Sequence, residues 1–227
     1  MTTGFHFEPL SHTYTFDGEV VPSITQVLKH SAGAGLYYGN GCPEALADFG
    51  KDRGTKVHQA CQYLVEGVLD LDTLDPVLVP FVGAWDKWLK ESGFQPVFVE
   101  EPEIRLSPVR YAGTPDYIGK LEGVWAVVNL KSGTSSIPRW VGLQTAAEGH
   151  LRSDAVIPRR IGLQLKPDGS FKMREFPQDE FLGDLDCFVA ALKIYEWKEG
   201  IAVKRGLREG ALRAEYESYC SAKGEKP

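Results

Sequence analysis

A carboxylate, an amide and a lysine occur close together in two neighbouring apolar segments of the chain. Asp116 lies in the segment 111–118, and Asn129 and Lys131 lie in the segment 124–131. In an extended strand alternate side chains share a face, so Asn129 and Lys131 point to the same side. A hairpin between the two segments brings Asp116 beside Asn129 at one end of a sheet. Such a set suits a divalent metal ion held by oxygen atoms, with a lysine that orients or deprotonates water.

The same residues also allow a purely structural interpretation. A pair such as Asp116 and Lys131 on neighbouring strands is often only a surface salt bridge, worth about 0–1 kcal/mol. An amide and an ammonium buried without partners would each cost several kcal/mol, so Asn129 and Lys131 need either polar partners or a ligand. These residues alone do not separate a salt bridge from a metal site.

The composition limits the classes of protein that could carry this chemistry. The chain has 227 residues, 43% of them hydrophobic, which predicts one compact domain over residues 1–227. Its 31 acidic residues outnumber the 25 lysines and arginines, for a formal net charge of −6. That balance excludes a broadly basic nucleic-acid coat protein. A nucleic-acid enzyme is still allowed, because a local basic channel or a bound divalent metal can supply the positive field.

Hydrophobic periodicity and turn signals predict an α/β fold whose central mixed sheet is flanked by helices. We expect an N-terminal hairpin region over 1–21, a short helix capped by Ser23, and a flexible tail over 221–227. Trp85 and Trp88 have helical spacing and are expected in the core. The other expected helices cover 53–65, 76–92, 138–151, 179–199 and 206–219, and the expected strands cover 5–7, 12–16, 96–106, 111–118, 124–131, 156–166 and 171–176.

The N-terminus and the cysteines indicate a reduced, cytoplasmic protein. The first residues lack the basic and apolar regions of a signal peptide, and no apolar run approaches the roughly 18 residues of a membrane span. Four cysteines, Cys42, Cys61, Cys187 and Cys220, are widely scattered. Cysteines in such a pattern are most often reduced and structural.

The motif residues resemble a known family of nucleases. Gly113-Thr-Pro-Asp116 followed by Asn129-Leu-Lys131 is similar to the PD-(D/E)XK signature, specifically that of the RecB-like exonuclease branch. Four further segments match this branch in order, and the matched stretch runs from about Pro22 to Glu148. They are Pro22-Ser-Ile-Thr-Gln-Val-Leu28, Arg53-Gly-Thr-Lys-Val-His58, Val99-Glu-Glu-Pro-Glu-Ile104 and Gln144-Thr-Ala-Ala147.

This resemblance implies a restriction-endonuclease-like core with a bound Mg²⁺ or Mn²⁺ ion. Asp116 and His58 would be metal ligands, Asn129 would occupy a further ligand position, and the backbone carbonyl of Leu130 would complete the shell. An ordinary histidine on a helix surface is the alternative for His58. Some related nucleases carry an iron–sulfur cluster on a C-terminal cysteine triplet. The C-terminal region here offers only two widely separated cysteines, so we expect no cluster.

The resemblance also implies roles for three residues around the metal. Lys131 would orient the attacking water and stabilise charge on the scissile phosphate. Gln144 would steady the lysine or a backbone phosphate, although an ordinary helix-surface glutamine fits nearly as well. Glu101 would be the acidic residue of the preceding strand. Glu100 competes with it, and strand alternation together with the spacing to Ile104 favours Glu101.

Two positions depart from the family pattern. Asn129 stands where the family has Asp or Glu, and an amide keeps a ligating oxygen but loses the charge that holds Mg²⁺. Natural loss of activity and an introduced Asp→Asn change both account for it, and we favour the introduced change. Glu148 stands where the family usually has Tyr, which leaves the role of that helix position open.

The resulting hypothesis is a stand-alone metal-dependent DNA exonuclease, similar to those that phages use in recombination, repair or genome processing. Arg53, Lys56 and Arg139 would bind backbone phosphate of single- or double-stranded DNA ends without reading sequence. A recombinase or a single-strand-binding protein would be a natural partner. The rival hypothesis is a non-catalytic DNA-binding protein with a degenerate nuclease site.

Overall fold

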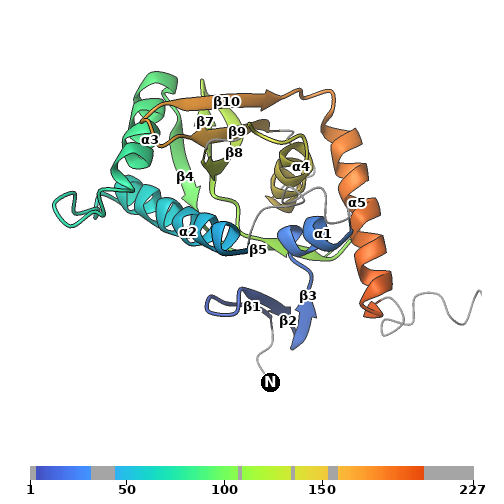
Figure 1. Cartoon of the computed structure of the whole chain (residues 1–227). Coiled ribbons are helices and arrows are strands. Elements are labelled where there is room, and N and C mark those ends of the chain that lie inside the picture. Colours follow the sequence, from blue (N-terminus) through green and yellow to red (C-terminus); the bar gives the residue numbers. More distant parts are fainter. Residues whose placement is uncertain (1–3, 32–43, 107–108, 134–135, 153–157, 202–227) are drawn as a thin grey trace, which may run out of the picture.

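The computed structural model describes residues 4–31, 44–106, 109–133, 136–152 and 158–201 (Figure 1). The expected helix over 206–219 and the expected tail over 221–227 lie outside these residues. Among the described helices, none combines the length and the apolar character that a membrane crossing requires.

A five-stranded sheet forms the centre of the molecule. Its strands, in spatial order, are β10 (Phe171–Phe176), β9 (Arg159–Leu165), β8 (Val124–Ser132), β7 (Tyr117–Leu121) and β4 (Gln95–Val99). All neighbouring strands are antiparallel except β8 and β9, which are parallel and are joined through helix α4 (Val141–Arg152). The sheet is therefore mixed. This confirms the predicted α/β class, and it is consistent with a restriction-endonuclease-like core.

Helices cover both faces of this sheet (Figure 1). Helices α2 (Glu44–Glu66) and α3 (Val79–Ser92) pack on one face. Helices α1 (Ile24–Ser31), α4 and α5 (Phe181–Lys198) pack together on the other. Trp85 and Trp88 are buried, as predicted, and the Trp85 ring centroid lies 4.5 Å from that of Tyr117 in β7. Helix α2 begins nine residues earlier than expected.

Strand β8 contributes to both layers because its side chains alternate. Val128 and Leu130 are fully buried in the apolar cluster that contains the α2 and α3 residues. Asn129 and Lys131 point to the other side, where they contact residues of α4. The alternation predicted from the sequence is thus observed, and the polar face of β8 meets the helix that follows it.

Two strands that we expected to be continuous are each broken in the middle. The segment 96–106 divides into β4 and β5 (Glu103–Arg105), and the segment 111–118 divides into β6 (Tyr111–Gly113) and β7. β5 and β6 pair with each other in a separate two-stranded sheet. Local chemistry explains both breaks. Glu100 has a positive φ of 49°, and Pro102 and Pro115 lack the N–H that a ladder requires.

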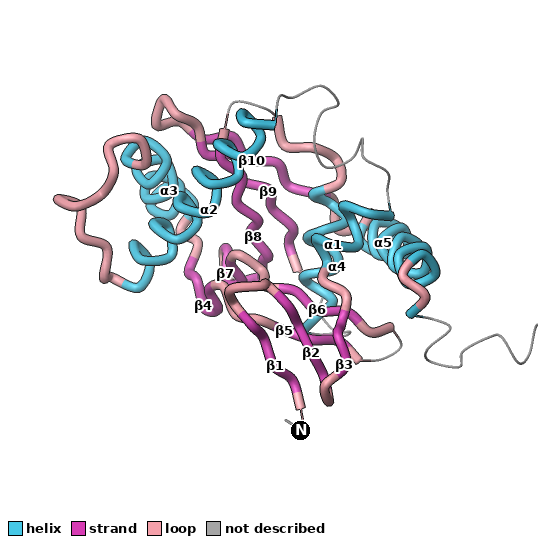
Figure 2. The backbone as a smooth tube through the Cα atoms, turned by 60° about the horizontal axis from the view of Figure 1, so that its bottom comes forward, coloured by secondary structure: helices cyan, strands magenta, loops and turns pink. Residues whose placement is uncertain are grey.

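A small antiparallel sheet at the N-terminus packs beside β5 and β6 (Figure 2). It consists of β1 (Phe5–Glu8), β2 (Thr13–Phe16) and β3 (Glu19–Val21), so the expected hairpin has a third strand. The Tyr14 hydroxyl lies 2.7 Å from that of Thr114, next to the break that contains Asp116. Ser23 caps α1 as predicted, because the Gln26 N–H donates to its Oγ at 3.1 Å and Gln26 Oε1 accepts from the Ser23 N–H at 3.0 Å.

Candidate active site

Asp116 occupies the bend that leads into β7, directly opposite the polar part of β8. The register pairs Tyr117 with Val128, which places Asp116 next to Asn129 in the hairpin. The Leu130 N–H donates to Asp116 Oδ2 at 2.6 Å, so the backbone of β8 fixes one carboxylate oxygen. This contact uses the N–H of Leu130, whereas the resemblance assigns a role to its carbonyl. That role remains a proposal.

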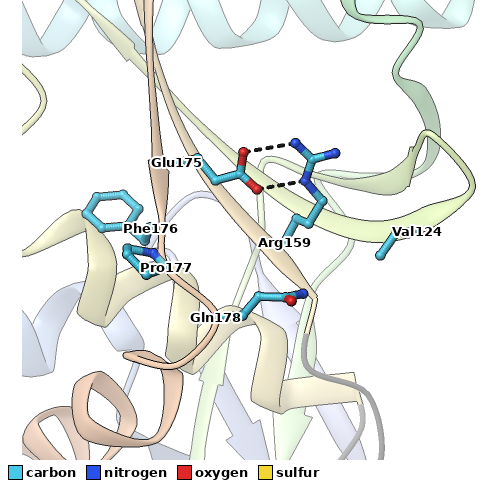
Figure 3. Close-up of a pocket in the computed structure, with 6 residues that line it drawn as sticks. All are labelled: Val124, Arg159, Glu175, Phe176, Pro177 and Gln178. Atoms are coloured by element: carbon cyan, nitrogen blue, oxygen red, sulfur yellow. Dashed lines mark hydrogen bonds and ion pairs between the residues drawn. The ribbon is translucent and has the colours of Figure 1, made fainter.

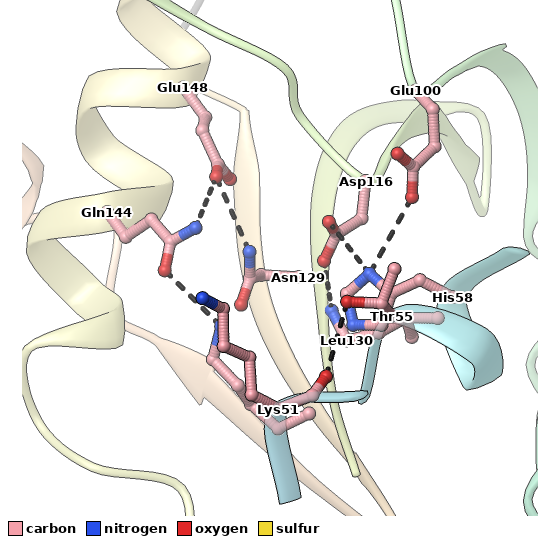
Figure 4. A network of polar contacts seen from close by, with 10 residues as sticks. Lys51, Thr55, His58, Glu100, Asp116, Asn129, Leu130, Gln144 and Glu148 are labelled. Carbon is pink, nitrogen blue, oxygen red and sulfur yellow. Dashed lines mark hydrogen bonds and ion pairs between the residues drawn. The ribbon is translucent and has the colours of Figure 1, made fainter. Parts of the chain in front are cut away.

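His58 and Glu100 complete a group of three potential metal ligands with Asp116. His58 comes from α2, and its Nδ1 lies 3.3 Å from Asp116 Oδ1 and 3.6 Å from Glu100 Oε1. One ligand atom from each of the three residues lies within 4.8 Å of the other two. Helix α2 and the two strand breaks therefore bring an imidazole and two carboxylates to one point (Figure 4).

The structure brings Glu100 to this group and does not bring Glu101, which the sequence favoured. The Glu101 carboxylate is instead paired with Arg152, whose Nη2 lies 2.9 Å from Oε2. The alternation that favoured Glu101 ends at Val99, because the positive φ of Glu100 turns the chain out of the strand. The proline at 102 signals a disturbed strand end, but it does not show which of the two glutamates turns inward.

A second group of polar side chains lies between β8 and α4 (Figure 4). Asn129 Nδ2 donates to Glu148 Oε1 at 3.4 Å, and Gln144 Nε2 donates to the same oxygen at 2.8 Å. Gln144 Oε1 accepts from Lys131 Nζ at 3.4 Å, and Lys131 Nζ also lies 5.2 Å from the centre of the Trp140 ring. Gln144 is thus positioned to steady the lysine, and Glu148 belongs to the same network.

Exposure separates the two groups. The side chains of His58 and Glu100 are 26% and 30% exposed. Asn129 and Glu148 are only 1% and 2% exposed. A substrate would therefore reach the site from the His58 side, while the Glu148 side forms its floor.

The contact between His58 and Asp116 decides the direction in which the pKa of each residue shifts. Burial by itself would lower the pKa of His58, but the charge of Asp116 and the contacts with Asp116 and Glu100 raise it to about 10. Burial would likewise raise the pKa of Asp116. The charge of His58, the contact with it, the charge of Lys131 and the Leu130 N–H together hold that pKa below its ordinary value. Without a metal, these residues form a histidinium–aspartate pair.

Burial has the largest effect on the pKa values of Glu148 and Lys131, the two ionisable residues between β8 and α4. It raises the pKa of Glu148 to about 8, reinforced by the charge of Asp116 and only partly offset by the hydrogen bonds from Gln144 and Asn129. Burial also lowers the pKa of Lys131, against the opposing effects of Asp116 and Glu148. Both shifts arise because burial disfavours the charged form of each group. A bound cation would stabilise the charged form of Glu148.

Comparisons with solved structures find exonucleases. A candidate exonuclease from Eubacterium rectale aligns over 69% of this chain and 69% of its own, with 13% identity and a TM-score of 0.45. LHK-Exo in complex with dAMP aligns over 82% of this chain and 93% of its own, with 11% identity and a TM-score of 0.33. Another structure of this alkaline exonuclease, from Laribacter hongkongensis, aligns over 65% and 84%, with 14% identity and a TM-score of 0.28. No family model and no curated protein matches the chain. At these values the likeness assigns no function.

The donor set fits a hard or borderline divalent cation. His58, Glu100 and Asp116 offer one nitrogen and several oxygens, a mixture that suits Mg²⁺ or Mn²⁺. Asn129 Oδ1 and Glu148 Oε2 are also buried, and neither has a hydrogen-bond partner among the described residues. Because buried polar atoms are nearly always paired, these two oxygens are candidate ligands for a bound cation.

The three predicted DNA-binding residues lie outside this hydrogen-bonded network. Arg53 and Lys56 share α2 with His58. The Arg53 guanidinium lies 5.3 Å from the centre of the Phe81 ring, and Lys56 Nζ is paired with Asp52 at 2.8 Å. Arg139 is exposed and lies shortly before α4.

A separate pocket lies near the other end of β8, lined by Val124, Arg159, Glu175, Phe176, Pro177 and Gln178 (Figure 3). Val124 begins β8, whereas Asn129 and Lys131 lie near its end, so roughly 17 Å of strand separate the pocket from the site. Arg159 Nε and Nη2 hold the Glu175 carboxylate at 2.7 and 2.9 Å, and Nη1 holds Glu122 at 2.7 Å. These contacts fix the arginine, and this pocket does not add to the site.

Proposed function

We propose that this chain is a metal-dependent DNA exonuclease of the PD-(D/E)XK superfamily, in its RecB-like branch. The observation that carries the proposal is the convergence of Asp116, His58 and Lys131 at one end of the sheet, with Lys131 in contact with Gln144. A surface salt bridge would not require this arrangement. Asp116 is 8% exposed, its carboxylate is held by a backbone N–H, and the lysine is on the strand that supplies that N–H.

The residues divide the proposed reaction between them. Asp116 and His58 would hold a Mg²⁺ or Mn²⁺ ion together with Glu100, the side-chain oxygen of Asn129 and the backbone carbonyl of Leu130. Such an ion, when bound, lowers the pKa of a coordinated water and neutralises charge on a phosphate. Lys131 would orient the attacking water and stabilise the negative charge that develops on the scissile phosphate.

The surroundings support DNA as the substrate. The chain carries a net charge of −6, so phosphates must be attracted locally. Arg53 and Lys56 on the helix of His58, and Arg139 ahead of α4, would contact the backbone of a single- or double-stranded end. We further propose a role in phage or prophage recombination, repair or genome processing, in the cytoplasm and beside a recombinase or a single-strand-binding protein.

The test is degradation of end-labelled single- and double-stranded DNA with Mn²⁺ or Mg²⁺. We expect the chain to degrade DNA only when a divalent ion is present, and Lys131→Ala to lower the rate at least about 100-fold because it removes charge stabilisation at the phosphate. Lys90→Ala, on the exposed surface of α3, is the matched control and should keep the full rate.

Asn129→Asp separates the remaining alternatives. If only this variant cleaves DNA, and Lys131→Ala abolishes that cleavage, the site is that of a nuclease inactivated at position 129. DNA binding without cleavage by every variant would contradict the enzyme and favour the non-catalytic DNA-binding protein. If the chain neither binds nor cleaves DNA, both hypotheses are wrong.

A further inference from the structure

The two residues that depart from the nuclease pattern contact each other. Asn129 stands where a carboxylate is expected and Glu148 where a tyrosine is expected, and Asn129 Nδ2 donates to Glu148 Oε1. They are 19 residues apart in the sequence, on β8 and α4. The strand thus carries an amide at the expected carboxylate position, and the helix places a carboxylate next to it.

The Glu148 carboxylate is only partly satisfied by its neighbours. Oε1 accepts from Gln144 and Asn129, but Oε2 is buried with no hydrogen-bond partner among the described residues. The same holds for Oδ1 of Asn129. Two unpaired oxygens from contacting side chains therefore lie at the floor of the site. Leaving buried acceptors unpaired costs free energy, and a cation bound beside them would offset that cost.

The residue type at 129 fits the presence of Glu148. An aspartate there would put a second carboxylate oxygen about where the amide nitrogen is, 3.4 Å from Glu148 Oε1. Like charges at that separation in a buried site cannot both ionise without a large cost. The amide donates a hydrogen bond instead and keeps one oxygen as a potential ligand. The pairing thus explains Asn129 without an introduced substitution.

We propose that Glu148 supplies to the metal ion the carboxylate that position 129 lacks. This inference rests on the proposed metal-dependent function. The negative charge expected on the strand at position 129 comes instead from Glu148 on α4. Asp116 and Asn129 then contribute oxygens from the two strands, and Glu148 contributes the charge from the helix. The site is complete with the residues that the chain has.

A structural role for Glu148 makes a different prediction. If it only accepts the hydrogen bond of Gln144 and so positions Lys131, glutamine at 148 would serve as well, because its carbonyl oxygen accepts the same bond. Glu148→Gln removes the charge while keeping size and shape. It therefore separates a charge that binds metal from an acceptor that positions a neighbour.

The experiment is Mn²⁺ titration of the full chain by isothermal calorimetry, without DNA. We expect Glu148→Gln to weaken Mn²⁺ binding at least about tenfold, because even a group that only contacts a metal ligand contributes about 10–100-fold to affinity. The double variant Asn129→Asp/Glu148→Gln returns the carboxylate to the strand and lets the glutamine donate to it, so it should recover most of the affinity. Glu91→Gln, on the exposed surface of α3, is the matched control for loss of one charge and should bind as the unmodified chain does.

Two results would overturn the proposal. One is Mn²⁺ affinity of Glu148→Gln within about twofold of the unmodified chain, well short of the expected tenfold loss. The other is a double variant that binds no better than Glu148→Gln. Circular dichroism shows whether Glu148→Gln folds. If it does not, Glu148→Asp, which keeps the charge on a shorter side chain, should bind Mn²⁺ more tightly than Glu148→Ser. Equal affinities of these two variants would contradict the proposal.

DNA degradation by the same variants separates this inference from the proposed function. If Mn²⁺ affinity follows the expected order but no variant degrades DNA, Glu148 is a metal ligand of a protein that is not a nuclease. If the unmodified chain and Glu148→Gln degrade DNA and bind Mn²⁺ equally well, the nuclease proposal survives and the role of Glu148 does not.

Discussion

The His58–Asp116 contact links metal binding to pH. Without metal, His58 is held in its charged form by Asp116 and Glu100, and its pKa is raised to about 10. A metal ion needs the neutral imidazole, so the ion must displace the proton. The same contact that stabilises the metal-free site at neutral pH therefore competes with the ion.

The direction of the pH effect follows from the raised pKa. The stability contributed by the protonated His58 is fully present below its unfolded value of 6.5, and it is lost as pH rises toward about 10. Mn²⁺ would displace the proton of His58 and, below its pKa of about 8, that of Glu148, and both are held less firmly as pH rises. We therefore expect the increase in melting temperature caused by Mn²⁺ to be larger at about pH 8.5 than at about pH 6.5.

Thermal unfolding with and without Mn²⁺ at the two pH values checks this expectation. His58→Gln cannot titrate in this range, so its smaller Mn²⁺ shift should depend less on pH. An equal shift at both pH values in the unmodified chain would show that His58 does not exchange a proton for the metal.

For single residues, the sequence predicted which side chains share a face of a strand better than it predicted which side chains turn at a strand end. Asn129 and Lys131 share a face because alternation in β8 runs without interruption. The position of Glu100 could not be predicted, because it depends on a single positive φ value at a strand end. Glu148 was visible as a departure from the family pattern. Its contact with Asn129 depends on how α4 packs across the sheet, which local pattern does not encode.

At the scale of elements, the close pairing of β4 with β7 leaves no room for a side chain at Gly119. Gly119 in β7 pairs with Pro96, next to an irregularity in the register of β4. A Cβ atom at Gly119 would lie 2.2 Å from the Gln95 carbonyl oxygen and 2.8 Å from the Phe94 ring. The backbone carbonyl cannot move away as a side chain would, so glycine is required there.

Gly119→Ala should therefore destabilise the protein by about 1–3 kcal/mol, the usual cost of overpacking. Gly83→Ala is the matched control, because a Cβ atom at that position of α3 meets nothing within 4 Å. Removing a helical glycine should stabilise by about 0.5–1 kcal/mol. Urea unfolding of the two variants measures both changes, and equal stabilities would contradict this account of β7.

The order of helices and strands followed from hydrophobic periodicity, but the breaks in two strands did not. Runs of apolar residues on both sides of Glu100 and of Thr114–Asp116 predict continuous strands. Prolines at 102 and 115 weaken the ladder at those points, and the two halves then join different sheets. These breaks matter for the site, because they carry Glu100 and Asp116 toward His58.

At the scale of the whole molecule, the site lies where the layers meet. Helix α2 brings His58 from one face of the sheet, and α4 brings Gln144 and Glu148 from the other. The parallel pairing of β8 and β9 requires a crossover, and α4 is that crossover. The topology thus places the functional helix opposite the polar face of β8. Because the net charge is negative, the proposed function requires a few basic residues near the site to hold DNA.

Salt dependence of DNA binding tests whether Arg139 is one of these residues. Each phosphate that a protein neutralises releases counterions, so removing one such contact should reduce the slope of log affinity against log salt by about 0.9 for double-stranded DNA or about 0.7 for single strands. We expect Arg139→Ala to lower the slope by one such step. It should also weaken binding equally for DNA ends of different sequence, because phosphates carry no sequence information.

Fluorescence anisotropy between about 50 and 200 mM salt, with Ca²⁺ replacing Mn²⁺ to limit cleavage, measures the slope over the range in which phosphate contacts change affinity most. Lys90→Ala on α3 should leave the slope unchanged, because its ammonium is paired with Asp86 on the exposed face of that helix. If Arg139→Ala leaves the slope unchanged, Arg139 does not contact DNA phosphate, and the proposed DNA path would run only along Arg53 and Lys56 on α2.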